Sequence, residues 1–440
     1  MMLRTIIKRE ILEYLKSAKF LIGLMIAIVL TAASTTLNVQ DYALRHQDYL
    51  DAKKEFTSNG FEIVVFRGPQ VLSALVRGKD RDLGSQGKIS IMEAPRRLTG
   101  YMGYEPGTSP SFAGFSAVDF AFLVRVVLSL LVVFLAYNAV SEEKANGTLK
   151  LALANAVPRD KFLLGKLMSG LVAVISPLAL VALLATLILV LHPAVTLSAE
   201  GLIRIVTMFV ISILYLSVFY TLGLFISVMT ERPAVSLMAL LQAWIFLVVI
   251  YPNLSVSLAE RIHPLPSEEL LAKQKDAVSE KHGAEIKKAN EGLHQVSPTR
   301  EDRRRFVEAW SDMTMDFDKI EEEFSRRQSA QMKLAEMLSA LSPAALYDQL
   351  TSRLAGTDIR EYDRFLEDAH RLWLSFIERA RLRYTNEEAY KKTTLPDFSH
   401  RSDSAAEALV SVWPQCLLLF LFNLIPFVLA YTGFLRRDLR

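Results

Sequence analysis

The sequence has 440 residues, of which 51% are hydrophobic, and its mean hydropathy is positive, which is unusual for a soluble chain. The 50 Lys and Arg residues nearly balance the 47 Asp and Glu residues and the charges collect in polar blocks, so nothing indicates a nucleic-acid-binding protein. The single cysteine, Cys416, lies in an apolar run, which excludes an intramolecular disulfide and a cysteine metal cluster.

The first 19 residues predict an amphipathic helix. Isoleucine and leucine recur there at helical spacing, opposite a charged face, which suits a helix lying along the cytoplasmic interface. The apolar run 20–38 follows this basic segment, as the core of a signal peptide would. It is longer than a typical signal core and lacks a clear cleavage site, so we interpret it as a retained membrane anchor.

Six stretches are long and apolar enough to cross a bilayer, which takes about 20 residues. They are residues 20–38, 117–139, 163–191, 203–229, 234–251 and 409–434. Basic residues gather in segment 1–19, in the loop 140–162 and in the tail 435–440. The positive-inside rule therefore predicts that this loop and both termini are cytoplasmic.

The two long insertions, 39–116 and 252–408, are then predicted to be external. The first begins as a polar helix that continues the first span and includes two β-like pieces, FEIVVF and KISIM. In the second, helical spacing from Glu301 to Leu341 predicts a long solvated hairpin or a short coiled coil. We therefore expect a mainly α membrane protein with six transmembrane helices, an amino-terminal interfacial helix and a large α-rich external domain with a small β part.

Motifs of catalysis and metal binding are missing from the sequence. There is no G-x-x-x-x-G-K-[ST] sequence to hold a nucleotide phosphate, so ATP hydrolysis would belong to another polypeptide. The seven histidines are scattered, with no H-E-x-x-H pair. We therefore expect no catalytic residue, no metal site and no cofactor in this chain.

Three polar residues inside the spans are candidates for a transport pathway, because such residues are costly in a membrane. Arg125 lies about two turns inside the second span, where it either faces a pathway between helices or extends outward to lipid headgroups. Gln242 and Asn423 are weaker candidates, expected to make hydrogen bonds between helices.

The loop 140–162 is the most informative cytoplasmic segment. It contains an acidic helix end at Glu142 and Glu143, a glycine break at Gly147 and a short amphipathic helix from Thr148 to about Ala154. Pro158 then opens the next span.

This loop resembles the region of ABC-2 type permeases that begins with E-x-x-x-G-T-L and continues with P-x-x-[RK] and a G-K pair. The similarity covers residues 118–191 and, more loosely, all six spans. It implies a coupling helix that docks into a cytoplasmic ABC ATPase subunit, with ATP and Mg²⁺ held by that partner. The residues that it assigns to ATPase coupling are Glu142, Glu143, Gly147, Thr148, Leu149, Leu151, Pro158 and Arg159.

A second resemblance, in the segments 341–346 and 354–358, is to a branch of these permeases with enlarged external domains, which includes relatives of the permease for nitrous-oxide-reductase maturation. It implies a second permease copy or a homologous permease, contact with membrane lipid and a bacterial cytoplasmic membrane location. The expected function is export, or transmission of ATP-driven motion to an external partner protein. The alternative is a membrane scaffold or sensor that does not transport, although a bare anchor needs neither six spans nor a coupling loop.

Overall fold

The computed structural model describes residues 2–55, 62–80, 86–92, 94, 118–149, 158–294, 297–394 and 396–436. Its elements begin with α1 (Met2–Lys16), α2 (Ala18–Glu55), β1 (Glu62–Phe66), η1 (Val71–Ala74), β2 (Gln86–Ser90), α3 (Phe120–Phe122), η4 (Leu123–Leu128), α4 (Ser129–Ala136), α5 (Ser141–Ala145) and α7 (Arg159–Leu191). They continue with α8 (Ala199–Met229), α9 (Pro233–Ile245), η5 (Phe246–Ile250), α10 (Tyr251–Ile262), α11 (Glu268–Leu293), α12 (Arg300–Ser339), α13 (Pro343–Ala355), α14 (Ile359–Thr385), α15 (Glu387–Lys392) and α16 (Ala405–Arg436).

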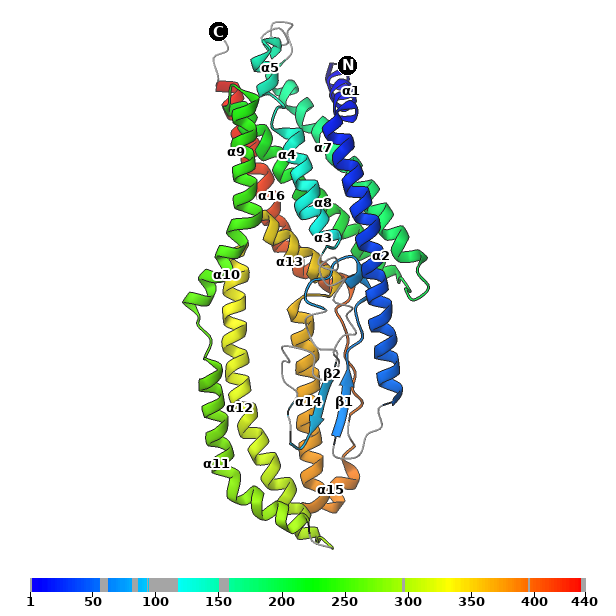
Figure 1. The fold of residues 1–440 in the computed structure, drawn as a ribbon, viewed down its shortest axis with the longest axis vertical. Helices are drawn as coiled ribbons and strands as arrows, with labels where there is room; N and C mark the ends of the chain where they lie inside the picture. The colour runs from blue at the N-terminus through cyan, green and yellow to red at the C-terminus, as the bar shows by residue number, and fades with distance from the viewer. Residues whose placement is uncertain are drawn as a thin grey trace.

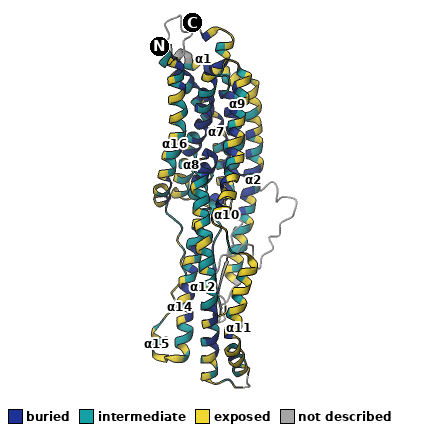
Figure 2. Ribbon diagram, turned by 90° about the vertical axis from the view of Figure 1, so that its left-hand side faces the viewer, coloured by how far each residue is buried: buried dark blue, intermediate teal, exposed yellow. Residues whose placement is uncertain are grey.

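Within the described part of the chain, six helical stretches are long and apolar enough to cross a membrane. They are Ala18–Lys54, Phe120–Ala145, Arg159–Leu191, Ala199–Met229, Pro233–Ile262 and Ala405–Arg436. Large apolar side chains such as Met25, Leu183 and Val410 are exposed on their outer faces, as contact with lipid requires. Figure 2 shows these exposed faces around a buried interior. The predicted mainly α membrane fold with six spans is confirmed.

Two spans extend further than their apolar runs. The first continues without a break as α2 to Glu55, as the polar helical pattern after residue 38 predicts. The fifth continues from α9 through η5 into α10 and ends at Ile262, beyond the expected end at residue 251. Both extensions run toward the same half of the molecule (Figure 1).

A separate core joins the two insertions. Strands β1 and β2 pair antiparallel, with Glu62 opposite Ser90 and Phe66 opposite Gln86. Their apolar residues pack with those of α11, α12 and α14, and Trp373 Nε1 donates a hydrogen bond to the Ser90 carbonyl at 3.0 Å. We call β1, β2, α11, α12, α14 and α15 the insertion domain. The two insertions thus share one core, and strands β1 and β2 overlap the β-like pieces FEIVVF and KISIM.

Helices α11 and α12 form a helical hairpin (Figure 1). The stretch Glu301 to Leu341, predicted to be a hairpin or a coiled coil, is only one arm of it, because α12 is a single continuous helix and α11 is the other arm. Helix α12 begins at a capping box, in which Thr299 accepts from the Asp302 backbone and Asp302 accepts from the Thr299 backbone. The sequence pattern placed this helix over Glu301 to Leu341, and the observed helix is Arg300–Ser339.

Helix α13 differs from the rest of the second insertion because it packs against the spans. It begins at the Ser342 N-cap and ends at Gly356, whose φ of +69° suits glycine. Ala344, Tyr347 and Leu354 are each fully buried in the same core as the spans, against α8 and α16. The insertion 252–408 is therefore not a single block apart from the membrane helices, because one of its helices is docked between them.

The molecule is elongated, and different elements lie at its two ends (Figure 1). Helix α1, helix α5 and the end of α16 lie at one end, and the insertion domain occupies the opposite half (Figure 1). Helix α8 runs between these two ends, beside α7, α16 and α4.

Candidate functional site

The short helix α5 is held at its start by Ser227 of α8. The backbone amides of Val140 and Ser141 each donate to Ser227 Oγ at 2.9 Å. The first amides of a helix have no partner within the helix, so a buried hydroxyl from another helix satisfies them. This contact fixes the beginning of the loop predicted to couple to an ATPase.

Lys144 holds the other side of α5 to the end of α8. Its ammonium group donates to the carbonyls of Ser227 at 3.3 Å, Val228 and Thr230 at 3.0 Å. The last carbonyls of a helix lack partners and carry the negative end of the helix dipole, so a cation is favoured there. Helix α5 and the carboxyl end of α8 are thus joined as one unit.

A buried ion cluster joins this loop to two further helices. Lys166 of α7 is 4% exposed and lies 2.7 Å from Glu10 of α1 and 2.6 Å from Glu143 of α5. Such a buried cation is stabilised only while its carboxylate partners remain in place. We call Glu10, Glu143 and Lys166 the Lys166 cluster. Sequence analysis named Glu143 but missed the other two, although a lysine inside an apolar span is itself a signal.

The residues predicted to couple to the ATPase take different positions. Glu142, Thr148 and Pro158 are exposed, whereas Arg159 donates to the Leu435 carbonyl of α16 at 2.9 Å. Gly147 has a φ of +71°, which explains the predicted glycine break. Residues 150–157 lie outside the described residues, and they include Leu151 and all of the predicted coupling helix after Leu149.

Leu149 does not have the exposed position of a docking residue. It is 1% exposed and packs with Phe162, Leu224 and Phe434 in a core at this end of the spans. Its side chain therefore holds the loop against the protein's own helices. Glu142, Gly147, Thr148 and Pro158 are the described positions of the predicted set that are exposed to a partner, and Glu142 is the charged one.

At its other end α8 is joined to α13. Ser212 and Tyr347 hydroxyl oxygens lie 2.9 Å apart, and the Tyr215 and Tyr347 rings stack with centroids separated by 4.6 Å. Near the start of α8, Arg204 donates to the carbonyls of Leu354 at 2.8 Å and of Asp403. The helix that contacts the coupling loop therefore also contacts the helix that precedes the insertion domain helix α14.

Two π-helical segments provide contacts for α13 and its neighbours. In η4 the carbonyl of Arg125 accepts from Tyr215 Oη at 2.9 Å, and in η5 the carbonyl of Leu247 accepts from Ser342 Oγ at 2.6 Å. A π-helix shifts the backbone hydrogen-bond pattern, and inside a membrane the carbonyls that it displaces need side-chain partners. Such segments are frequent at functional sites.

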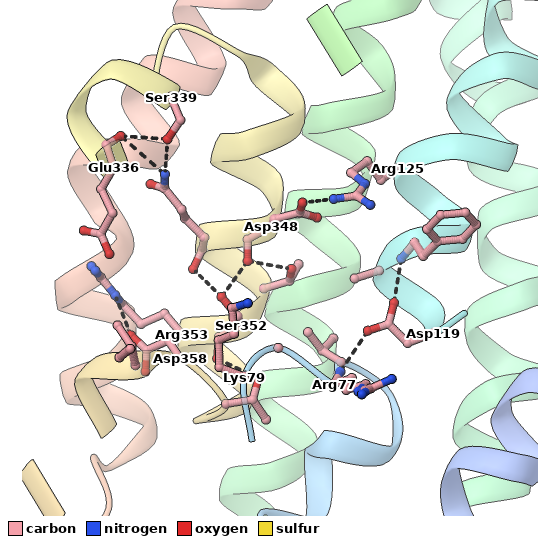
Figure 3. A pocket seen from close by; sticks show the side chains of 18 of the residues that line it. Arg77, Lys79, Asp119, Arg125, Glu336, Ser339, Asp348, Ser352, Arg353 and Asp358 are labelled. Atoms are coloured by element: carbon pink, nitrogen blue, oxygen red, sulfur yellow. Dashed lines mark hydrogen bonds and ion pairs between the residues drawn. The ribbon is translucent and has the colours of Figure 1, made fainter. Parts of the chain in front are cut away.

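A cavity of about 690 Å³ lies where α12 and α13 meet the second and fifth spans. Arg125 lines it and forms an ion pair with Asp348 of α13 (Figure 3). Of the two readings of Arg125, the structure therefore agrees with the one in which it faces a space between helices.

The two weaker pathway candidates lie elsewhere. Asn423 donates to the Leu214 carbonyl of α8 at 2.9 Å, which is the expected hydrogen bond between helices. Gln242 is exposed on the outside of α9, so the structure gives it no place in this cavity.

Comparison with known families agrees with the six spans and the loop that α8 holds. A family model described as "ABC-2 family transporter protein" matches residues 4–439, nearly the whole chain. The chain belongs to the ABC-2 transporter family. As an ABC-2 protein with six apolar helices, it is a multi-pass permease component of an ABC transporter. No curated protein matches the sequence.

Proposed function

We propose that this chain is the permease subunit of an ABC transporter driven by a separate ABC ATPase subunit, and that it transmits the motion of that subunit to the insertion domain. The ATPase binds ATP and Mg²⁺ and docks on the loop 140–162, and the permease chain itself is not an enzyme. Family membership supports an ATPase partner, and the missing nucleotide motif agrees with it.

The observation that carries the proposal is that α8 is attached at both ends. Lys144 and Ser227 join its carboxyl end to the coupling loop. Arg204 and Ser212 join its amino-terminal half to α13 and its neighbours. Since a packed helix moves largely as a rigid body, displacement of the loop is passed along α8 to α13 and from there to α14.

The basic short loops support a cytoplasmic position for residues 140–162 and for both termini, and an external position for the insertion domain. In a bacterial cytoplasmic membrane, two permease copies with two ATPases would then drive two insertion domains. We favour transmission of motion to an external partner over export through the spans, because the long insertion domain is connected directly to the moving helices.

The test measures nucleotide-dependent movement rather than transport, because it then requires no knowledge of the substrate. A spin label at Ala330→Cys in α12, in a Cys416→Ser background, reports the distance between the two insertion domains of the assembled complex. Trapping the ATPase with ATP and vanadate should change this distance. In the double variant Arg204→Gln/Tyr347→Phe the change should shrink, while ATPase assembly and basal hydrolysis persist.

Arg261→Gln is the matched control, because Arg261 is exposed at the end of α10. It should retain the full change in distance. An unchanged distance in the wild-type complex, or an undiminished change in the double variant, would contradict transmission through α8.

A further inference from the structure

The cavity beside Arg125 has walls from both the membrane helices and the insertion. Ala121 and Phe122 begin the second span, and Val256 lies near the end of the fifth, so the cavity is at the end of the spans that faces the insertion domain. Met332 and Ala335 of α12 supply the opposite wall. An occupant would therefore meet apolar surface continuous with the membrane interior on one side and the insertion on the other.

The charged groups of the cavity have both signs and spare bonding capacity. The Nε atoms of Arg125 and Arg353 are buried, and among the described residues neither finds a hydrogen-bond partner. The Arg353 side chain as a whole is 9% exposed, with its Nε 3.7 Å from Asp358. Figure 3 shows both arginines among the side chains that line the cavity. Each guanidinium has five N–H donors, and the structure uses only part of them, since Arg125 pairs with Asp348 and Arg353 donates to the Ser411 carbonyl at 3.1 Å. The remaining donors of these cavity-lining arginines suit an anionic ligand.

Four carboxylates line the same space, Asp119, Glu336, Asp348 and Asp358, and two of them are clearly more exposed than the others. The side chain of Asp348 is 37% exposed and that of Glu336 is 30% exposed, and both line the cavity. Each already pairs with an arginine, but a carboxylate has about four acceptor positions and can also bind an ammonium group. The arginines could therefore bind a phosphate, and the carboxylates could bind a cationic group close to it.

We propose that this cavity binds the headgroup of a zwitterionic phospholipid with a primary ammonium, taken from the membrane leaflet beside the insertion domain. Its size lies within the range of about 300–1,000 Å³ that is common for small-ligand sites. An anionic lipid without an amine would leave the carboxylates opposite negative charge. A quaternary ammonium would have no N–H to donate. The proposal goes beyond the motion proposed above and does not depend on it.

The experiment uses the full-length permease alone in lipid nanodiscs, without an ATPase, so that its result is independent of coupling. The probe is phosphatidylethanolamine with a photoreactive group near the glycerol, and mass spectrometry locates the labelled peptides. We expect labelling in the segments 119–125 and 332–336. Unlabelled phosphatidylethanolamine should compete at least about tenfold better than phosphatidylcholine or phosphatidylglycerol, as expected for one hydrogen bond to a charged group.

Two variants test the residues. Asp348→Asn should reduce the preference for phosphatidylethanolamine over phosphatidylcholine. Ala335→Phe should abolish labelling by filling the cavity without changing its charge. Lys333→Phe is the matched control, because Lys333 lies on the same helix but is exposed and does not line the cavity. It should be labelled like the wild type, which also shows that an added aromatic ring on α12 is tolerated.

Three results of the labelling experiment would overturn the proposal, and the soluble competitor supplies a fourth. They are equal competition by the three lipids, wild-type labelling in Ala335→Phe, and labelling confined to other segments. Soluble phosphoethanolamine, which has no acyl chains, should not displace the probe at the same concentration. Displacement would assign the site to a soluble zwitterion and would also overturn the lipid assignment.

Discussion

Lys166 contacts carboxylates from two other helices although it lies inside the third span. Replacing it with methionine keeps the length of the side chain but leaves Glu10 and Glu143 without their buried cation. Removing one partner of a buried ion pair typically costs about 3–5 kcal/mol. We therefore expect Lys166→Met to lower the thermal stability of the purified permease strongly.

Lys161→Met is the control, because Lys161 is exposed on the same helix and should be nearly neutral. Adding Glu10→Gln and Glu143→Gln to Lys166→Met should recover part of the stability, since the stranded charges are removed. If Lys166→Met melts with the wild type, the cluster does not hold the loop.

We predict that the segment around His400 is sensitive to pH, because His400 lies between two carboxylates of α14. Its ring nitrogens lie 2.8 Å from Asp368 and 3.2 Å from Glu361. Burial lowers the pKa of His400, but these carboxylates outweigh it and raise the pKa above its ordinary value of 6.5. Burial likewise opposes ionisation of Glu361, but hydrogen bonds from His400 and Ser402 bring the pKa of Glu361 down to about 2.

The opposite pKa shifts of His400 and Glu361 predict a range of pH in which both residues stabilise the fold. The raised pKa of His400 contributes stability that is complete below 6.5 and is lost as pH rises through the folded-state value. The depressed pKa of Glu361 contributes stability that is complete above its ordinary value of 4.5 and is lost as pH falls toward about 2. Hydrogen exchange in the segment 398–404, corrected for intrinsic rates, should therefore be faster at about pH 8.5 than at about pH 6. In His400→Gln this difference should shrink, and equal corrected rates in the wild type would exclude the effect.

Sequence reasoning succeeded for residues whose role follows from local pattern. The glycine break at Gly147 follows from composition alone, and so does the placing of Glu143 in an acidic helix end. It could not find Asp348, because this residue pairs with Arg125 across 223 positions of sequence. It also gave Leu149 the role of a docking residue, because an amphipathic pattern does not reveal which surface covers the apolar face.

Helix α5 and the residues after it pack against the spans and, in the function proposed above, also dock on the ATPase subunit, and two variants separate these two roles. Leu149→Ala removes a fully buried side chain, which typically costs about 2–5 kcal/mol. Glu142→Arg reverses an exposed charge and should leave stability within about 0.5 kcal/mol.

We expect Glu142→Arg to weaken binding of the ATPase subunit, measured by copurification, without lowering the stability of the permease. Leu149→Ala should instead lower the melting temperature of the permease, and any loss of ATPase binding should follow from this loss of stability. Normal ATPase binding in Glu142→Arg would remove Glu142 from the docking surface.

At the scale of elements, apolar runs located the spans but not their ends. The extension of α2 follows from a polar helical pattern, which sequence reasoning recognised. The predicted fifth span ends at residue 251, just before Pro252, but the helix continues into α10 because proline is tolerated in the first turn of a helix. Docking of α13 against the spans depends on long-range contacts of Tyr347 and Leu354, which no local pattern shows.

Orientation in the membrane is a prediction about the whole molecule. With Cys416→Ser as background, Asn146→Cys and Ala330→Cys introduce thiols at exposed positions, one after α5 and the other in α12 of the insertion domain. An impermeant thiol reagent should label the second but not the first on intact cells, and both after the cells are opened. The reverse pattern would invert the topology.

The composite insertion domain also determines when the protein can finish folding. Strands β1 and β2 are synthesised long before α14, against which Ile89 is fully buried. Roughly 270 residues separate Ser90 from Glu361, and at about 5–20 residues per second their synthesis takes roughly 15–55 s. Throughout that interval the pair of strands β1 and β2 has uncovered strand edges and apolar side chains, which are sites for incorrect pairing. We therefore expect the pair of strands β1 and β2 to need a chaperone during biosynthesis.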